Sequence, residues 1–218
     1  MRLRIGTPRC LLVIAPHPDD ETIGAFGLIT RLRRRGVAVR VLVVTDGHAS
    51  HRNSRAWPGA RLVAERQRET RRALRPIGVS AGDIAFLRFP DGDLERTSNS
   101  ARRCIIAAVR RAPKPLLVVA PGSGDNHPDH RVVAACVASA RVNGVRALAY
   151  PVWPAGKAVR RSRTLTLSTQ ERFAKRRAIR SYRTQAGRII DDPEGFAMTS
   201  GQIAAFSRPT EHFVESRR

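Results

Sequence analysis

A chain of 218 residues is long enough to form one domain with a substantial core. Hydrophobic residues make up 42% of it and aromatic residues only 5%, which is typical of an α/β protein built from Val, Ile, Leu and Ala and argues against a disordered chain. The formal net charge is +22, and nearly all of the positive charge is arginine. This charge favours an anionic partner such as nucleic acid, a phosphate-bearing substrate or an acidic membrane surface. The alternative is that arginines spread along the whole chain coat solvent-facing helices.

Apolar runs and amphipathic helical segments alternate along the first two thirds of the chain. The sequence predicts strands at 11–15, 37–45, 84–89, 116–120 and 145–152, and helices at 22–35, 61–77, 101–111 and 128–141. This alternation indicates parallel βαβ units, so we expect an α/β protein with a Rossmann-like three-layer α/β/α sandwich and a mostly parallel sheet.

The remainder of the chain is less regular. Its predicted elements are a strand at 165–167, a basic helix at 168–182, a short helix at 201–206 and a last strand at 212–214. We expect one domain over residues 1–218, with a Rossmann-like core at 1–152 and a C-terminal elaboration of helices and strands at 153–218.

Three cysteines lie inside apolar runs and lack CxxC spacing. Cys10, Cys104 and Cys136 are therefore expected to be buried small hydrophobes in a reducing compartment. No apolar run approaches the ~20 residues of a membrane span, and the apolar segment near the start is too short for a secretory signal. We expect a cytoplasmic protein without a transmembrane span. Peripheral membrane contact stays open, and the sequence does not indicate the oligomeric state.

Polar side chains follow two of the predicted strands where each ends in Ala-Pro. The first string reads His17-Pro18-Asp19-Asp20-Glu21 and the second reads His127-Pro128-Asp129-His130. Because ligands bind outside the carboxyl ends of strands in an open parallel sheet, we expect the two strings to face one another. Proline and acids are ordinary helix-start residues, but capping does not require histidine. Two such strings therefore predict a hydrolytic site, because metal-binding and proton-transfer groups stand where a nucleotide site would have a Gly-rich turn.

Both strings have a spacing that suits metal ligands. His17 and Asp20 are three residues apart, which puts two side chains on one side of a starting helical turn, and His127 and His130 repeat this spacing. Zinc in hydrolytic sites takes three nitrogen or oxygen ligands and leaves a position for water. These four residues are therefore candidates for three ligand positions. Asp19 is not among them, because its side chain points away from that of its neighbour Asp20.

The strings resemble the motifs of the PIG-L/LmbE-like metal-dependent N-deacetylases, which include GlcNAc-PI de-N-acetylases and the deacetylases of mycothiol and bacillithiol synthesis. Residues 16–21 match the family's (P/A)-H-P-D-D-E motif, and residues 127–130 match its H-P-D-H motif. Residues 66–69 are similar to its R-x-x-E helix, residues 89–92 to its Pro-Asp-Gly turn, and residues 178–185 to a stretch that often ends in Ser-Gln. The resemblance covers residues 10–150 well and implies an LmbE-like fold.

The resemblance also implies a metal centre. His17, Asp20 and His130 would hold Zn²⁺, although a His/Asp site also accepts Fe²⁺, Mn²⁺ or Co²⁺. The chain departs from many relatives after the second strand, where they place a Gly-Glu or similar pair and this sequence has Gly47-His48 and then His51. We expect those two histidines to face substrate or solvent.

Catalytic roles follow from the same resemblance. Asp19 would be the general base, taking a proton from metal-activated water and delivering it to the departing amine. His127 would be the electrophilic or acid partner at the oxyanion, and Asp129 would orient it. Glu21 would support the helix start. The implied substrate is a small N-acetylglucosamine-type conjugate, with or without a phosphate group, that yields acetate and a free amine.

Three further residues are predicted to bind substrate at the rim. Asp46, Arg66 and Asp91 lie on segments that should reach it, where sugar hydroxyls or a phosphate are plausible partners. The alternative for Asp46 and Asp91 is turn chemistry, since each precedes a glycine. Arg66 could instead pair with Glu69 along a helix face.

Two other classes of function compete with a deacetylase. A metallo-phosphoesterase or nuclease would suit the positive field, but two-metal phosphoryl chemistry generally needs more carboxylates than the strings supply. A non-enzymatic nucleic-acid-binding protein would rest on charge alone, because few aromatic residues are interleaved for base stacking. We therefore expect no stable nucleic-acid partner.

Overall fold

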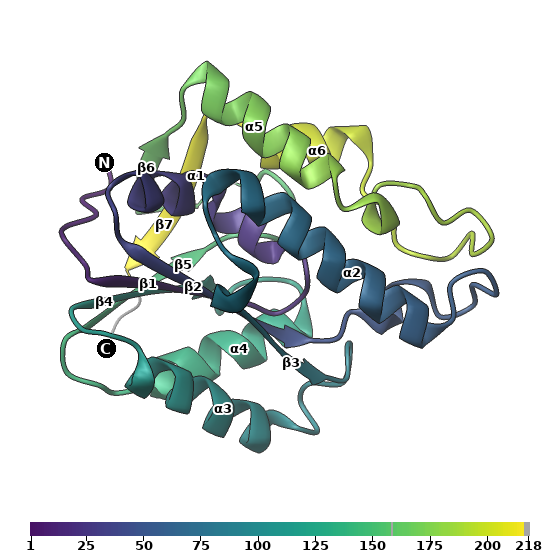
Figure 1. Ribbon diagram of the computed structural model, residues 1–218, viewed down its shortest axis with the longest axis horizontal. Coiled ribbons are helices and arrows are strands. Elements are labelled where there is room, and N and C mark those ends of the chain that lie inside the picture. Colours follow the sequence, from purple (N-terminus) through teal and green to yellow (C-terminus); the bar gives the residue numbers. More distant parts are fainter. Residues whose placement is uncertain (158, 216–218) are drawn as a thin grey trace.

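A seven-stranded sheet lies between two layers of helices in the computed structural model, which describes residues 1–157 and 159–215 (Figure 1). The strands are β1 (Cys10–Ala15), β2 (Ala38–Thr45), β3 (Ile84–Phe89), β4 (Leu116–Pro121), β5 (Val145–Tyr150), β6 (Arg163–Thr166) and β7 (Thr210–Glu215). The α-helices are α1 (Asp20–Arg34), α2 (Gly59–Leu74), α3 (Ser98–Arg111), α4 (Pro128–Ser139), α5 (Thr169–Arg180) and α6 (Ser200–Phe206). Short 3₁₀ turns are η1 (His48–His51), η2 (Arg75–Ile77), η3 (Ala81–Asp83) and η4 (Arg183–Gln185).

The strand order is β3-β2-β1-β4-β5-β7-β6. The first five strands pair in parallel, and β7 runs antiparallel to both β5 and β6. The predicted three-layer sandwich with a mostly parallel sheet is therefore confirmed. Residues after 152 add β6 and β7 to the same sheet and α5 and α6 to one helical layer.

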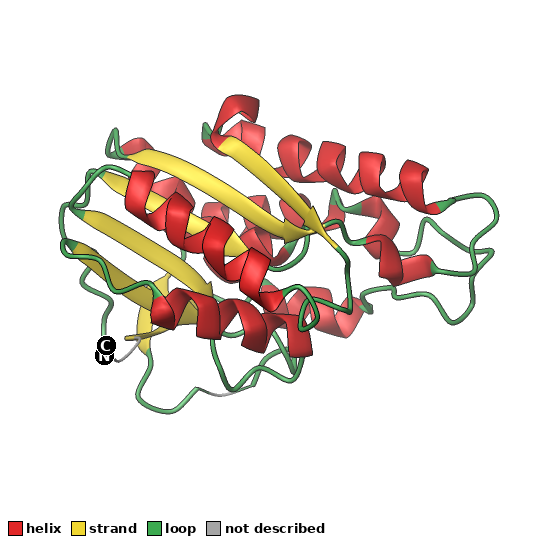
Figure 2. Cartoon of the chain, turned by 90° about the horizontal axis from the view of Figure 1, so that it is seen from below, coloured by secondary structure: helices red, strands yellow, loops and turns green. Residues whose placement is uncertain are grey.

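The two helical layers pack on opposite faces of the central strands. Helices α3 and α4 cover one face, and α1, α2, α5 and α6 lie on the other (Figures 1 and 2). Every residue of β1 is buried, and its side chains alternate between the layers: Leu11 and Val13 join one core cluster, whereas Leu12 and Ile14 join the other. This period-2 alternation with both faces buried explains why β1 reads as an uninterrupted apolar run.

The strand order reverses between β1 and β4. From β1 the sheet continues to β2 and β3, and from β4 it continues to β5 on the other side. Such a reversal leaves a crevice outside the carboxyl ends of the two strands, where neither following helix covers it. Both polar strings begin here, because one follows β1 and the other follows β4.

Most predicted elements agree with the structure to within one to three residues. Helix α3 begins at Ser98, three residues before its predicted start, and η1 lies between β2 and α2. Helix α5 starts after Ser168, whose side chain forms a capping box with Glu171. The three cysteines are unpaired, but Cys104 is only partly buried. None of the helices in residues 1–157 and 159–215 has the length and apolar character needed to cross a bilayer.

Candidate metal centre and active site

Three donor atoms from the two strings form a triangle at the crevice between β1 and β4. Nδ1 of His17 lies 3.2 Å from Oδ2 of Asp20 and 3.2 Å from Nε2 of His130, and the last two atoms are 3.2 Å apart. All three side chains are at most 10% exposed. Tetrahedral ligands about 2.0–2.1 Å from a zinc ion are separated by roughly 3.3 Å, so two nitrogens and one carboxylate oxygen fit a divalent ion here.

Carboxylates bind the outward ring nitrogens of both histidines. Nε2 of His17 lies 3.0 Å from Oδ1 of Asp91 and 3.2 Å from Oδ2 of Asp129, and Nδ1 of His130 lies 3.1 Å from Oδ1 of Asp125. Burial opposes protonation of His130, but the charge of Asp20 and the close contact with the Asp125 carboxylate raise its pKa to about 9. Metal-ligating histidines characteristically donate their second nitrogen to a carboxylate, which fixes the tautomer and the ring orientation.

Asp129 does not orient His127 in the way the sequence predicted. Its carboxylate accepts hydrogen bonds from the main-chain N–H groups of Gly92 (2.8 Å) and Leu94 (3.2 Å) and faces His17. Only its main-chain N–H contacts His127, donating to Nδ1 at 3.2 Å. The reason is local: His127 is the N-cap of α4, so its ring turns back onto the first free N–H of the helix while the side chain of Asp129 points to the loop after β3.

His127 lies beside the triangle and is partly exposed to the cavity. Its ring centroid is 4.6 Å from that of His17 and 4.9 Å from that of His130. Since Nδ1 accepts the capping hydrogen bond, Nε2 is the nitrogen left to carry the proton. Burial and then the charges of His17 and His130 lower the pKa of His127.

Asp19 has a backbone conformation that non-glycine residues rarely adopt. Its φ is +133°, and it forms the N-cap of α1. Its N–H donates to the buried carboxylate of Glu21 at 3.1 Å, and that carboxylate is also bound by the hydroxyl of Tyr182. Burial raises the pKa of Asp19 to about 8, although the charge of Arg66 opposes this shift.

Arg66 is buried and binds groups of the protein, in contrast to the free side chain expected at the rim. Its guanidinium donates to the carbonyl oxygens of Gly47 and Pro18, both at 2.8 Å, and to Oδ2 of Asp19 at 3.3 Å. The alternative pairing with Glu69 is not found, because the Glu69 carboxylate accepts from the N–H and hydroxyl of Thr184. Arg66 also lines the cavity, so its contact with substrate stays a prediction.

The other two predicted substrate-binding residues differ from each other. Asp91 is buried, lines the cavity, and accepts from the N–H of Ala49 while pairing with His17. Asp46 is not among the cavity-lining residues; its carboxylate accepts from the N–H and ring of His48, as expected for turn chemistry. His51 is buried against Gly195. Neither His48 nor His51 belongs to a potential metal-binding group in the described chain.

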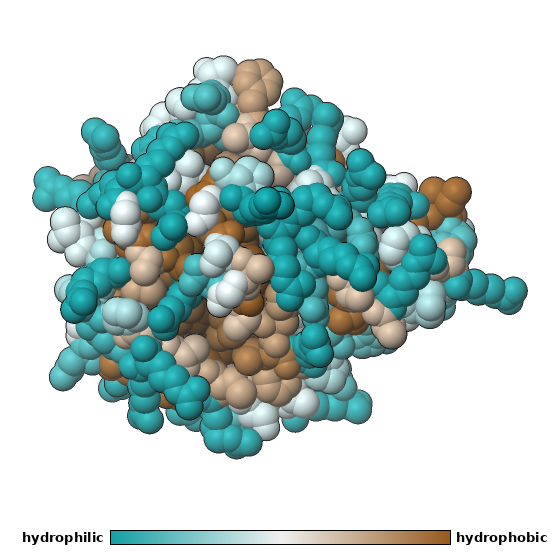
Figure 3. Space-filling view, in the orientation of Figure 1, coloured by the Kyte–Doolittle hydropathy of each residue, from teal (hydrophilic) through white to brown (hydrophobic). Residues whose placement is uncertain are grey.

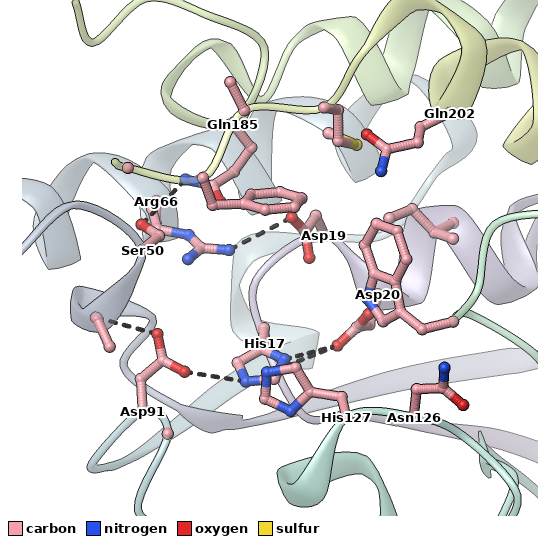
Figure 4. A pocket seen from close by; sticks show the side chains of 18 of the residues that line it. His17, Asp19, Asp20, Ser50, Arg66, Asp91, Asn126, His127, Gln185 and Gln202 are labelled. Carbon is pink, nitrogen blue, oxygen red and sulfur yellow. Dashed lines mark hydrogen bonds and ion pairs between the residues drawn. The ribbon is translucent and has the colours of Figure 1, made fainter. Parts of the chain in front are cut away.

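The site opens into a cavity of about 840 Å³ whose far wall comes from the C-terminal elaboration (Figure 4). Figure 4 shows His17 between Asp20, Asp91 and His127, with Asp19 and Arg66 on the opposite side of the opening. The apolar part of the wall is formed by Trp153, Phe196 and Met198, and the two aromatic rings meet edge to face at 5.8 Å. Gln185 and Gln202 add amide groups to this wall.

Asp125 and the aromatic cavity wall were not predicted from the sequence. Asp125 stands two residues before His127, and its spacing to both histidines of the second string was the available signal. Trp153 and Phe196 carried no signal, because they are far apart in a stretch without regular periodicity.

Comparison with known proteins identifies the class to which this fold and site belong. The family model PIG-L, described as GlcNAc-PI de-N-acetylase, matches residues 12–141, more than half of the chain. The chain therefore belongs to the PIG-L family.

Individual relatives agree with this assignment. A diacetylchitobiose deacetylase from Thermococcus kodakarensis is 34% identical over 124 residues, which are 56% of this chain and 45% of the relative. A 1D-myo-inositol 2-acetamido-2-deoxy-α-D-glucopyranoside deacetylase from Rhodococcus erythropolis is 29% identical over 65% of this chain and 55% of its own length. The matches thus span about half of these relatives. In fold, N,N'-diacetylchitobiose deacetylase from Pyrococcus horikoshii superposes with a TM-score of 0.74 at 23% identity, over 95% of this chain and 83% of that one.

Proposed function

We propose that this chain catalyses metal-dependent hydrolysis of the N-acetyl group of a small N-acetylglucosamine-type conjugate, releasing acetate and a free amine. The observation that supports this most directly is the triangle of His17 Nδ1, Asp20 Oδ2 and His130 Nε2 with 3.2 Å sides at the mouth of a cavity. Membership of the PIG-L family supports the same reaction. The two relatives described above are named for deacetylation of N-acetylated sugars.

His17, Asp20 and His130 would hold the metal. A divalent ion, when bound there, supplies a water of lowered pKa and polarises the amide carbonyl. Zn²⁺ is the proposed ion because two imidazoles and a carboxylate suit it, and Fe²⁺, Mn²⁺ and Co²⁺ suit the same donors.

Asp19 is the proposed general base. It lines the cavity next to the triangle, and Arg66 and the strained N-cap backbone fix its carboxylate in place. From this position it can accept a proton from the attacking water and pass it to the amine nitrogen as the C–N bond breaks. The positioning by Arg66 matters because a base must lie within hydrogen-bond reach of the proton it removes.

His127 is the proposed donor to the oxyanion. The capping hydrogen bond from Asp129 N–H occupies Nδ1, which leaves Nε2–H for the carbonyl oxygen as it gains negative charge. One well-placed donor of this kind typically contributes about 3–4 kcal/mol of transition-state stabilisation.

The substrate sugar would lie against the C-terminal wall. Trp153 and Phe196 provide flat apolar surfaces for the ring, and Ser50, Gln185 and Gln202 provide hydrogen-bonding groups. The cavity volume of about 840 Å³ leaves room for an aglycone beyond one sugar, so a conjugate is proposed over a free monosaccharide.

The metallo-phosphoesterase alternative has less support. In the described chain the two potential metal-binding groups share His17, one with His127 and His130 and the other with Asp91 and Asp129, so they are not the two independent sites that two-metal phosphoryl chemistry uses. A reducing, cytoplasmic location remains a proposal that rests on the three unpaired cysteines.

Mass spectrometry of product formation tests the proposal. The metal-loaded protein is incubated with a panel of N-acetylglucosamine conjugates, neutral and phosphate-linked, and the products are examined for loss of one acetyl group. We expect turnover of at least one conjugate, abolished in Asp19→Asn and unaffected in the surface variant Asp93→Asn. Phosphate release from a nucleotide panel without any acetate release would overturn it.

A further inference from the structure

A second, strongly basic hollow lies between α2 and α5, apart from the active-site cavity. It has a volume of about 550 Å³ and is lined by Glu65, Arg72, Arg177, Arg180, Arg183 and Arg188 together with Ser181. No residue lines both this arginine groove and the active-site cavity. Figure 3 shows hydrophilic side chains gathered over α2 and α5, the part of the surface to which the groove belongs.

The arginines of the groove are not neutralised by the protein. Glu65 is the one acidic residue that lines it, and this carboxylate is shared between Arg188 at 3.4 Å and Arg72 at 3.9 Å, with Arg68 at 3.2 Å from outside the groove. Within the described residues, Arg177, Arg180 and Arg183 have no carboxylate partner. The groove therefore carries an excess of positive charge, which favours a bound anion.

The helix dipole explains the positions of only some of these arginines. Arg177 and Arg180 lie in the last turn of α5, where cations favour the helix dipole. That effect does not require Arg183 and Arg188, which follow the helix, or Arg72, which comes from α2. Four segments therefore contribute guanidinium groups to one hollow, and all five arginine side chains there are exposed to solvent.

The segment that carries Arg183 is fixed from beneath. The next residue, Thr184, is buried and binds Glu69 of α2 through its N–H (3.0 Å) and its hydroxyl (2.6 Å). The third residue of the same turn, Gln185, lines the active-site cavity. The groove thus has a preorganised floor, which lowers the ordering cost of binding.

We propose that the arginine groove binds the phosphoryl group of a small multiply charged anion, such as a diphosphate or a sugar phosphate. Guanidinium groups present paired donors that match phosphate oxygens, so several of them around one hollow favour a compact ligand with two or more negative charges. A hollow of this size suits such a ligand better than an extended nucleic-acid backbone or a flat membrane surface. The proposal does not depend on deacetylase activity.

Isothermal titration calorimetry with inorganic pyrophosphate tests this assignment on the metal-loaded protein. The test variant is Arg177→Gln/Arg180→Gln/Arg183→Gln. Its matched control is Arg103→Gln/Arg110→Gln/Arg111→Gln, which removes the same charge from exposed positions of α3 on the other face of the sheet. We expect the groove variant to bind pyrophosphate at least about tenfold more weakly, since each lost charged hydrogen bond changes affinity by roughly that factor. The control should bind like the wild type.

Equal weakening in both variants would overturn the proposal, because it would assign binding to overall charge. Binding that survives in the groove variant would also overturn it, because the anion would then occupy the metal centre. The assignment to a small anion would also be overturned if the protein does not bind pyrophosphate but binds a duplex oligonucleotide or phosphatidylserine vesicles through the groove arginines. We expect the groove variant to turn over a neutral N-acetyl sugar like the wild type. Such a result would show that any loss of pyrophosphate binding does not come from damage to the active site.

Discussion

The carboxylate of Asp125 lies 3.1 Å from Nδ1 of His130, on the side of the imidazole that faces away from His17 and Asp20. The same carboxylate accepts hydrogen bonds from the main-chain N–H groups of Trp153 (2.8 Å) and Val152 (3.2 Å). One side chain therefore fixes both the orientation of a proposed metal ligand and the segment that carries the aromatic wall.

Asp125→Asn is expected to weaken metal binding about 10–100-fold, because the neutral amide holds the His130 ring less firmly and lowers its basicity. Competition with a chromophoric chelator measures this change without reference to activity. Asp93→Asn is the control, since that carboxylate is about half exposed and pairs with Arg96 on the surface. Equal metal affinity in the two variants would show that Asp125 does not position His130.

Asp19→Asn is expected to keep the metal and lose activity. The side chain is not part of the triangle, so metal stoichiometry by mass spectrometry should match the wild type, while kcat should fall by about 10²–10⁴ because the general base is gone. Loss of metal together with activity would instead make Asp19 a ligand, contrary to the proposed division of roles.

Tyr182→Phe is expected to lower the free energy of unfolding by about 1.5–3 kcal/mol, the usual contribution of a hydrogen bond to a charged group. The hydroxyl binds the fully buried carboxylate of Glu21 and lies 3.0 Å from the hydroxyl of Thr22, so its loss leaves a buried acid with one donor fewer. Urea denaturation measures the effect. A double-mutant cycle with Glu21→Gln should show a non-additive pair, and simple additivity would mean that the two groups do not interact.

Trp153→Ala is expected to raise KM for a sugar substrate about tenfold, corresponding to ~1.4 kcal/mol of lost apolar contact, with metal content unchanged. Steady-state kinetics separates KM from kcat. Phe173→Ala is the matched control, because that ring is 68% exposed on α5 and does not line the cavity. A fall in kcat alone would place the indole away from the bound sugar.

Local chemistry explains why the sheet and the first contacts of the site could be predicted from sequence. The apolar run of β1, buried on both faces, and the matching run of β4 mark the central strands, and the polar strings directly follow them. The meeting of His17 and His130 then follows from parallel strand topology, which brings residues 113 apart in sequence to one crevice.

Side-chain directions and the packing of the cavity wall could not be predicted from the sequence. The direction of the Asp129 carboxylate depends on the N-cap geometry of α4 and on free N–H groups of the loop after β3, which no spacing encodes. Arg66 was expected at the rim. Its burial could not be predicted, because it depends on the carbonyl oxygens of two loops that are distant in sequence. Trp153 and Phe196 meet only through tertiary packing of an irregular segment.

Anomalous diffraction at the metal absorption edge, from crystals of the metal-loaded protein, tests the central claim most directly. The account predicts one peak about 2.0–2.2 Å from His17 Nδ1, Asp20 Oδ2 and His130 Nε2, with Asp19 and His127 outside bonding distance. A peak held by another set of side chains, or the lack of any peak between the two strings, would contradict it.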